Sequence, residues 1–424
     1  MKKFLALIIA LVMALSLVAC GEQKQPETPD VPDDGEQTAT IKVGFITLHD
    51  ENSTYDLNFI NAAKEAIANL GLTENDYILK TNIEEGQKCY DTAAELADAG
   101  CNIIFADSFG HESYMIQAAK DFPDVQFCHS TGTRAHTENL PNYHNAFASI
   151  YEGRYLAGIA AGMKMNEMIE AGKFTADEAK MGYVGAFTYA EVVSGYTSFY
   201  LGAKSVCPTV TMDVTFTGSW YDETLEKEGA QKLIDGGCKL ISQHADSLGA
   251  PTACENAGIP NVSYNGSTQA AGPNTYIISS RIDWAPYYEM AIKAVMDGTE
   301  IPVDYTGDLK TGSVVLTDLN TAVAAEGTQA AIDEAMAKLE NGDLHVFDCS
   351  TFTTSVELNP FKTDYLTVDA DGHITSYLAD VDTDEAYAGD TEVITSGYFS
   401  ESTARSAPYF DLSIDGINLL DTKM

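Results

Sequence analysis

The alternation that decides the fold begins with residues 41–48, IKVGFITL, and residues 56–70, DLNFINAAKEAIANL, which Gly71 follows. The first stretch is short, apolar and rich in β-branched residues, which is typical of a buried parallel strand. The second stretch places apolar residues at helical spacing and stops at a glycine, as many helices do. Together the two stretches predict the first strand and the first helix of a βαβ unit.

The same alternation continues in two rounds, separated by a long helical stretch at 150–170. In the first round we expect strands at 77–80, 102–106 and 125–128 and helices at 84–99 and 113–121. In the second round we expect strands at 181–187, 212–216, 239–244 and 261–264 and helices at 193–206, 224–235 and 251–257. This order predicts an α/β fold of two doubly wound, Rossmann-like lobes, each with helices on both faces of a parallel sheet. Beyond about residue 341, short strands such as 365–368 and 374–377 are expected instead.

The N-terminal residues have the pattern of a targeting segment. Lys2 and Lys3 precede an apolar run at 4–19 that is short for a membrane span of about 20 residues, which indicates a secretory signal over residues 1–20. The run ends in LVACG at 17–21, which resembles a bacterial lipobox and implies a lipidated Cys20 as the mature N-terminus. The alternative is an ordinary signal peptide with an incidental cysteine. Proline and acidic residues dominate 21–40, which predicts a disordered acidic tether.

Composition excludes several classes of function. The chain has 424 residues, with 63 Asp and Glu against 24 Lys and Arg, and a formal net charge of −39. This length favours two domains, and a hydrophobic content of 45% is enough for real cores. The negative charge repels phosphate backbones and anionic headgroups, so we expect neither nucleic-acid binding nor electrostatic docking on membranes. The charge also favours an uncharged ligand or a cation over a phosphorylated nucleotide.

Sequence motifs for catalysis and cofactor binding are not found. The chain contains no Walker A sequence, no GxGxxG after a strand, no GxSxG, no HExxH and no CxxC. We therefore predict no catalytic residue, no cofactor and no metal site. Seven cysteines remain after Cys20, an odd number that argues against a complete disulfide framework and favours buried thiols.

The loops after the predicted strands hold aromatic and polar side chains instead. Such loops carry the functional residues of open α/β sheets. Aromatic faces stack on planar ligands, and carboxylates and amides form hydrogen bonds with hydroxyls and ring nitrogens. For any one aromatic residue the alternative is packing at the edge of a lobe. The predicted ligand-binding residues from these loops are Tyr55, Asn58, Asp107, Phe109, Tyr189, Trp220, Asp222, Asp246 and Trp284.

Several blocks, in this order, resemble the basic membrane protein (Bmp, PnrA-like) family, the substrate-binding lipoproteins of ABC importers. The blocks are IKVGFI at 41–46, NIIFAD at 102–107, FPDVQF at 122–127, YEGRYLAG at 151–158, MGYVG at 181–185 and GSWYD at 218–222. The resemblance runs from about residue 41 to about residue 298 and is poor after 312. It implies the type I periplasmic-binding-protein fold, with a ligand cleft between the two lobes.

The resemblance implies capture of a purine nucleoside or a related base, stacked between aromatic residues of the two lobes. Asn58 would take the amide role of the first loop and Tyr55 would stack on the ring. Asp107, Trp220 and Asp222 would occupy the loops that follow strands in the two lobes.

Three positions depart from the nucleoside-binding pattern of that family. Leu48 stands where such members carry an Asp, and Asn265 stands near the position of the Asp that binds the ribose. The family's late Lys has no clear match, with Arg281 as the nearest cation and our predicted substitute. A free base, or another planar metabolite such as riboflavin, therefore remains open as the ligand.

These observations predict a lipid-anchored, extracytoplasmic receptor that is not an enzyme. Its partners would be the small-molecule ligand, an ABC permease, and the membrane through the lipid on Cys20. We expect the first lobe to comprise 41–148 with 274–300, and the second lobe to comprise 149–273 with 301–424, including the acidic C-terminal extension. The alternatives are a sensory receptor for the same ligands and a nucleoside-processing enzyme.

Overall fold

The computed structural model describes residues 41–381 and 391–423. The predicted signal peptide, the tether and the lipidated Cys20 lie outside these described residues. Within them, no helix combines the length and the apolar character that a membrane crossing needs. The seven cysteines of the described part of the chain are all buried, and none forms a disulfide.

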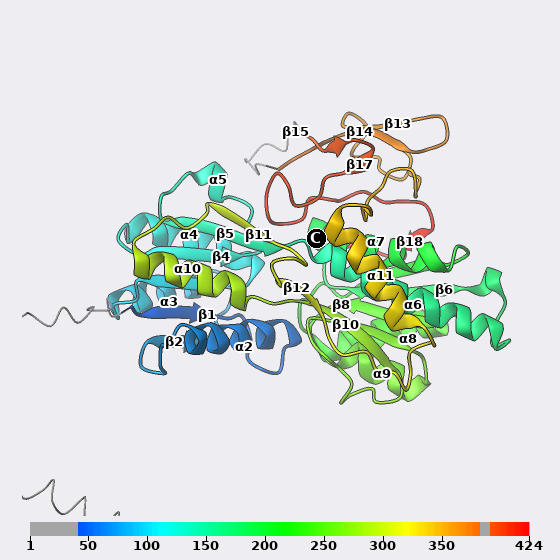
Figure 1. The fold of residues 1–424 in the computed structure, drawn as a ribbon, viewed down its shortest axis with the longest axis horizontal. Coiled ribbons are helices and arrows are strands. Elements are labelled where there is room, and N and C mark those ends of the chain that lie inside the picture. Colours follow the sequence, from blue (N-terminus) through cyan, green and yellow to red (C-terminus); the bar gives the residue numbers. More distant parts are fainter. Residues whose placement is uncertain (1–40, 382–390, 424) are drawn as a thin grey trace, which may run out of the picture. The chain divides into compact units, whose positions relative to one another are not determined.

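The first lobe is built on a parallel sheet of six strands in the order β11-β5-β4-β3-β1-β2 (Figure 1). The strands are β1 Val43–Ile46, β2 Tyr77–Lys80, β3 Ile103–Ala106, β4 Gln126–Ser130, β5 Tyr143–Ala148 and β11 Asp304–Gly307. One face is covered by α2 Thr54–Asn69 and α10 Ala285–Asp297, and the other by α3 Gln87–Asp98 and α4 Glu112–Asp121. The short helices η1 Phe109–His111 and α5 Ala135–Glu138 follow β3 and β4.

The second lobe repeats this arrangement in a sheet of seven strands, in the order β12-β10-β9-β8-β6-β7-β18. The strands are β6 Lys180–Gly185, β7 Thr211–Phe216, β8 Leu240–His244, β9 Asn261–Tyr264, β10 Tyr276–Ile282, β12 Val314–Leu316 and β18 Ile417–Leu419. Its helices are α6 Ile150–Glu170, α7 Ala190–Val206 and α11 Thr328–Asn341 on one side and α8 Glu223–Asp235 and α9 Gly249–Ala257 on the other, with the short helix η2 Ala176–Glu178 before β6. Six strands of this sheet follow the order of the first sheet, although β12 pairs antiparallel with β10 and β18 is an additional edge strand. The predicted pair of doubly wound lobes is confirmed.

The chain crosses between the lobes at different places from those predicted. β10 pairs in parallel with β9, so residues 276–282 belong to the second lobe and not to the first. β11 pairs with β5, so residues 304–307 belong to the first lobe and not to the second. The expected boundaries at 274 and 301 are therefore wrong. The physical reason is that β10 continues the second sheet beside β9, and the chain crosses to the first lobe only where that strand ends.

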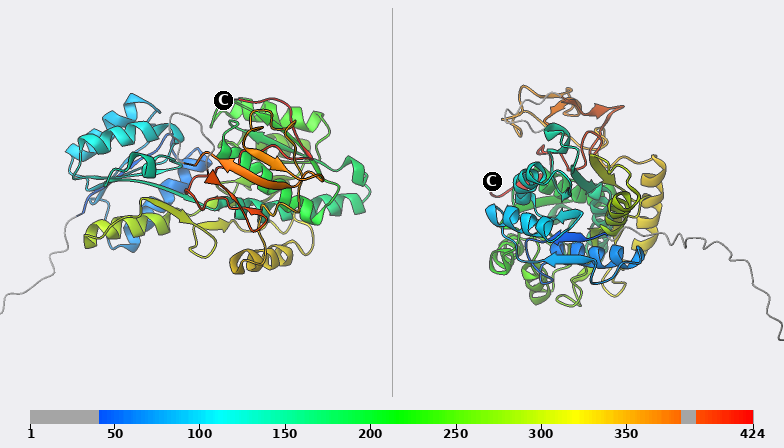
Figure 2. Two further views of the ribbon diagram at one scale, coloured as in Figure 1. Left: turned by 90° about the horizontal axis from the view of Figure 1, so that it is seen from above. Right: turned by 90° about the vertical axis from the view of Figure 1, so that its left-hand side faces the viewer.

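The C-terminal segment forms the short strands and turns that its composition predicts. These strands are β13 Leu366–Val368, β14 Ile374–Ala379, β15 Thr391–Glu392, β16 Ile394–Thr395 and β17 Tyr398–Phe399. Apolar side chains of this segment, among them Phe347, Phe399 and Phe410, enter the core of the second lobe. The orange and red ribbon of the segment lies against the green ribbon of that lobe (Figure 2). It also contacts the first lobe, because the Ser406 N–H donates to Oδ2 of Asp304 at 3.0 Å. The segment is therefore part of the folded body.

Candidate ligand-binding site

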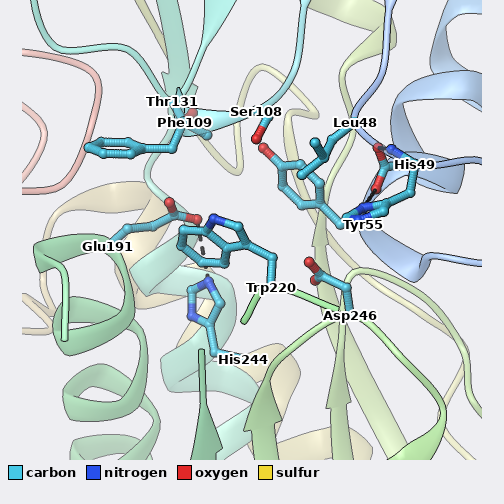
Figure 3. A pocket seen from close by; sticks show the side chains of 11 residues that line it. Leu48, His49, Tyr55, Ser108, Phe109, Thr131, Glu191, Trp220, His244 and Asp246 are labelled. Atoms are coloured by element: carbon cyan, nitrogen blue, oxygen red, sulfur yellow. Dashed lines mark hydrogen bonds and ion pairs between the residues drawn. The ribbon is translucent and has the colours of Figure 1, made fainter. Parts of the chain in front are cut away.

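A cavity lies where the carboxyl ends of the two sheets face each other. Its volume in this arrangement is only about 20 Å³, so a small organic ligand could enter only if the walls moved apart. The first lobe lines it with Leu48, His49, Tyr55, Asp56, Ser108, Phe109 and Thr131, and the second with Glu191, Trp220, His244 and Asp246 (Figure 3). Every one of these residues follows or ends a strand, or begins the helix after it, which is where open α/β sheets place their functional groups.

Asp56 organises the first-lobe wall of the cavity. Its Oδ1 accepts the N–H of His49 at 2.7 Å, and its Oδ2 accepts the hydroxyl of Ser53, the N-cap of α2, at 2.5 Å. Burial alone would raise the pKa of the Asp56 carboxyl, but the hydrogen bonds from His49 and Ser53 hold that pKa below its ordinary value. Asp56 is therefore a fixed negative charge that ties the loop after β1 to the start of α2.

Asp107 lies behind this wall as a second, nearly inaccessible carboxyl. Its Oδ1 accepts the N–H of Leu48 at 3.1 Å, and its backbone carbonyl accepts the hydroxyl of Tyr55 at 2.6 Å. Its Oδ2 has no hydrogen-bond partner among the described residues. Burial and the negative charge of Asp56 raise the pKa of Asp107 well above its ordinary range. A proton on Asp107 would remove the repulsion between the two carboxyls.

The second-lobe wall is built from the loops after β7 and β8. The N–H of Asp246 donates to the carbonyl of Trp220 at 3.0 Å, which joins the two loops. The Trp220 indole packs against the rings of Phe187 and Tyr189, with centroid distances of 5.1 Å and 6.1 Å. Burial, and then the charges of Asp56, Glu226 and Glu191, raise the pKa of Asp246 well above its ordinary range.

Glu191 and His244 form the third part of the site. Oε1 of Glu191, at the start of α7, lies 3.3 Å from Nε2 of His244, the last residue of β8. His244 is buried, and its burial together with the charge of Arg154 lowers the pKa of the imidazole to about 4. The imidazole is therefore neutral at neutral pH, and Glu191 presents its carboxylate to the cavity (Figure 3).

The two lobes touch each other around the cavity. The N–H and the hydroxyl of Thr54 both donate to the carbonyl of Asp246, at 3.0 Å and 3.1 Å. The rings of Phe109 and Tyr189 stack across the gap with centroids 5.2 Å apart. The site is thus closed by contacts between the lobes.

The structure brings some of the predicted site residues together in the cavity. Tyr55, Phe109, Trp220 and Asp246 line it. Tyr189 packs against both Phe109 and Trp220 at its rim, and Asp107 lies directly behind.

The other predicted residues lie elsewhere. The amide of Asn58 donates to the carbonyl of Ile282 and accepts from Nη1 of Arg281 at 3.3 Å, which places both side chains at a crossing between the lobes. Asp222 caps α8 by accepting the N–H of Leu225. Trp284 is 2% exposed and stacks on Phe59, with a centroid distance of 4.5 Å, in the core of the first lobe.

The sequence did not single out Glu191, His244 or Asp56 as site residues. Their common signal is position, since each directly ends a strand or starts a helix at the carboxyl edge of a sheet. In the described part of the chain, no group of three or more His, Cys, Asp or Glu side chains is arranged to hold a metal ion.

Comparison with known proteins agrees with this geometry. The family model described as ABC transporter substrate-binding protein PnrA-like (Bmp) matches residues 44–342. A purine-binding protein of Brucella abortus (strain 2308) is 32% identical over 310 residues, which cover 72% of this chain and 83% of that protein. A Haloferax volcanii protein named as a candidate ABC transporter glucose-binding protein is 33% identical over 259 residues, which cover 61% of this chain and 62% of that protein.

Solved structures show the same fold. An ABC transporter solute-binding protein from Aeropyrum pernix K1 matches with a TM-score of 0.61 and 18% identity, over 72% of this chain and 93% of that chain. At this identity the similarity concerns the fold alone, and it confirms the predicted two-lobed α/β architecture.

Proposed function

Because this chain belongs to the PnrA-like (Bmp) family of ABC transporter substrate-binding proteins, we propose that it captures a purine base or nucleoside between its two lobes. The family consists of solute-binding proteins rather than enzymes. The observation that carries the proposal is the composition of the cavity, where aromatic rings and carboxylates meet from both lobes. Rings such as Tyr55 and Trp220 offer faces for a planar heterocycle, and carboxylates accept hydrogen bonds from its N–H groups or from ribose hydroxyls.

The charge of the site supports an uncharged ligand. Asp56, Glu191 and Asp246 line the cavity, and none of its eleven lining residues is Lys or Arg. A phosphate group would meet the carboxylates of Asp56 and Glu191 and find neither Lys nor Arg among those residues. A neutral molecule with several donors fits better.

We further propose that the protein delivers its ligand to an ABC permease from the extracytoplasmic face of the membrane, anchored through the lipid on Cys20. The relationship to transporter substrate-binding proteins supports the permease as partner. The LVACG sequence at 17–21 supports the anchor. Metabolic labelling with a radioactive fatty acid tests the anchor, since Cys20→Ser should abolish the label.

A sugar is the second candidate ligand. The name of the Haloferax volcanii relative favours it, and the same carboxylates could accept hydrogen bonds from sugar hydroxyls.

Calorimetry with purified protein separates these ligands. The panel contains adenine, guanine, hypoxanthine, their nucleosides, riboflavin, glucose and adenosine monophosphate. We expect binding of at least one purine base or nucleoside at micromolar or tighter affinity, and much weaker binding of the monophosphate. Binding of glucose or riboflavin alone would replace the purine assignment, and the absence of heat with every compound would remove it. Chromatography of the recovered ligand should show it unchanged, whereas a cleaved nucleoside would indicate an enzyme.

A further inference from the structure

A buried polar layer lies in the second lobe behind the cavity. This layer lies on the sheet face under α6 and α7, near the carboxyl ends of the strands. Each of its side chains has one polar atom without a hydrogen-bond partner among the described residues. They are Tyr183 on β6, Ser242 and His244 on β8, Tyr264 on β9 and Ser280 on β10. The register pairs Tyr183 with Ser242 and Tyr264 with Ser280, so these side chains share one face. His244 connects this layer to the cavity.

Arg154 on α6 covers the layer. Arg154 is only 1% exposed. Its guanidinium lies over the ring of Tyr264, with Cζ 3.3 Å from the ring centroid. Nη1 donates to the carbonyl of Gln243 at 3.1 Å, but Nε and Nη2 have no partner in the described part of the chain. A buried cation with unused donors is costly unless a nearby group accepts from it.

One unused acceptor beside Arg154 belongs to His244. Its Nε2 faces Glu191, and its Nδ1 has no partner among the described residues. A Cβ placed on Gly195 of α7 would lie 3.0 Å from His244 Nδ1 and 3.5 Å from Arg154 Nε, so both atoms border the same small space. With its proton on Nε2, a neutral His244 donates to Glu191 and offers Nδ1 as an acceptor to Arg154. This one tautomer gives both unused atoms a role.

We propose that Arg154 and His244 are positioning residues, which hold the Glu191 carboxylate in the cavity as the acceptor for an N–H or O–H donor of the ligand. In the proposed arrangement the guanidinium would donate to Nδ1 of the imidazole, whose Nε2 already lies 3.3 Å from one carboxylate oxygen of Glu191, and the second oxygen would be left for the ligand. This inference rests on the proposed function. It adds that Glu191 selects for ligands that carry a hydrogen-bond donor.

The charges around His244 favour the neutral ring that this role requires. Arg154 faces it from α6, Glu191 from α7 and Tyr264 from the neighbouring strand β9. Burial and the guanidinium both oppose protonation of the imidazole, and Glu191 alone among its principal charged neighbours favours it. Removing the guanidinium should therefore let His244 titrate nearer to neutral pH.

Nuclear magnetic resonance of the histidine rings tests this arrangement without a ligand. In the full-length protein labelled with ¹⁵N-histidine, we expect His244 to carry its proton on Nε2 and not to titrate between pH 5.5 and 8. In Arg154→Met its signals should titrate within that range. A proton on Nδ1 in the wild-type protein, or titration near pH 6.5, would overturn the positioning role. If Arg154→Met does not fold, Gly195→Ala keeps the guanidinium but crowds the space between the two atoms, and His244 should then be a mixture of its two tautomers.

Ligand binding gives the second measurement. For a purine that the wild-type protein binds, Glu191→Gln and His244→Phe should each weaken affinity at least tenfold. The matched control is His144→Phe, because His144 is also buried with a lowered pKa but bonds to Pro302 and Gln126 of the first lobe, away from the cavity. We expect the control to keep wild-type affinity.

The outcomes separate this inference from the proposed function. Wild-type affinity in Glu191→Gln would overturn the inference while leaving purine capture intact. Failure of the wild-type protein to bind any purine would overturn the proposed function and the ligand role of Glu191 together. The resonance experiment would then still decide whether Arg154 sets the state of His244.

Discussion

The two tryptophans of the chain have different surroundings, which predict different effects of substitution. Trp220 lines the cavity, whereas Trp284 is stacked on Phe59 inside the first lobe. Trp220→Ala should weaken ligand binding by at least about 1 kcal/mol through loss of a stacking face, measured by calorimetry. Trp284→Ala should instead lower the free energy of unfolding by about 3–5 kcal/mol, measured by urea denaturation. Unchanged affinity in Trp220→Ala would mean that Trp220 only packs against Phe187 and Tyr189.

A buried carboxyl in the C-terminal segment predicts a specific dependence of stability on pH. Glu401 accepts the N–H groups of Tyr409 and Phe410, and burial raises its pKa to about 7. Because the folded state holds this proton more tightly than the unfolded state, its stabilising effect is full below about pH 4.5 and is lost as the pH rises through about 7.

Between pH 5 and pH 8 the wild-type protein should therefore lose about 2 kcal/mol more unfolding free energy than the Glu401→Gln variant. Urea denaturation of both proteins at the two pH values measures this difference. The exposed Glu334, which pairs with Lys338, provides the control, and Glu334→Gln should leave the difference unchanged. Parallel pH profiles for Glu401→Gln and the wild-type protein would show that Glu401 does not carry the effect.

At the level of single residues, the sequence could locate the site but not select every member of it. Tyr55, Phe109, Trp220 and Asp246 were predictable because each comes soon after the end of a strand. Glu191 and His244 were not, because a sequence does not distinguish a buried acid or imidazole from an exposed one. Trp284 was predicted to bind the ligand but lies in the core of the first lobe, because a side chain near the end of a strand can point into the core as well as into a cleft.

The pair α6 and α7 shows how glycines determine the packing of two helices. A Cβ on Gly158 of α6 would lie 2.1 Å from the carbonyl oxygen of Phe199, and one on Gly202 of α7 would lie 2.0 Å from that of Tyr155. Backbone atoms cannot move aside as a flexible side chain can. The two helices therefore approach as closely as they do only because both positions lack a side chain.

Gly158→Ala should lower the free energy of unfolding by about 3 kcal/mol or more, because it separates these helices. Gly229 of α8 is the control, since the atoms nearest to a Cβ there would be side-chain carbons of Val184 and Thr215, at 3.4 Å and 3.5 Å. Gly229→Ala should be neutral or stabilising by up to about 1 kcal/mol through higher helix propensity. Thermal and urea unfolding of the two variants measure the contrast, and equal effects would contradict the close approach of α6 and α7.

At the level of elements, periodicity predicted the strands and helices of both rounds, but it missed β5, β10 and β11 and the helices α10 and α11. β5 reads YHNAFA and β10 reads YIISSRI, so both mix buried polar residues with apolar ones. Asn145 and Ser279 have no exposed surface, and hydrogen bonds satisfy them in ways that a pattern of hydrophobicity does not reveal. Missing β10 is also what displaced the predicted lobe boundaries.

At the level of the whole molecule, the C-terminal segment predicts the effect of truncation. Residues 343–424 lie beyond the part of the chain that the family model matches, yet they supply Phe347, Phe399, Phe410 and Leu412 to the core of the second lobe. A chain ending at Gly342 should therefore lose the cooperative thermal transition and aggregate, since it exposes the apolar side of α6 and α7. Circular dichroism and light scattering measure both effects. A soluble truncated chain with the wild-type transition would show that the segment is dispensable.

The position of β11 late in the sequence affects how the protein folds during its synthesis. β5 ends at Ala148, and its neighbour β11 begins only at Asp304, after the whole run of strands β6 to β10. A chain emerging from the ribosome therefore cannot complete its first sheet until most of the second has been made. Such long-range pairing slows folding and leaves an intermediate with uncovered apolar surface. Nascent chains of this topology should depend on chaperones until the strand at 304–307 arrives.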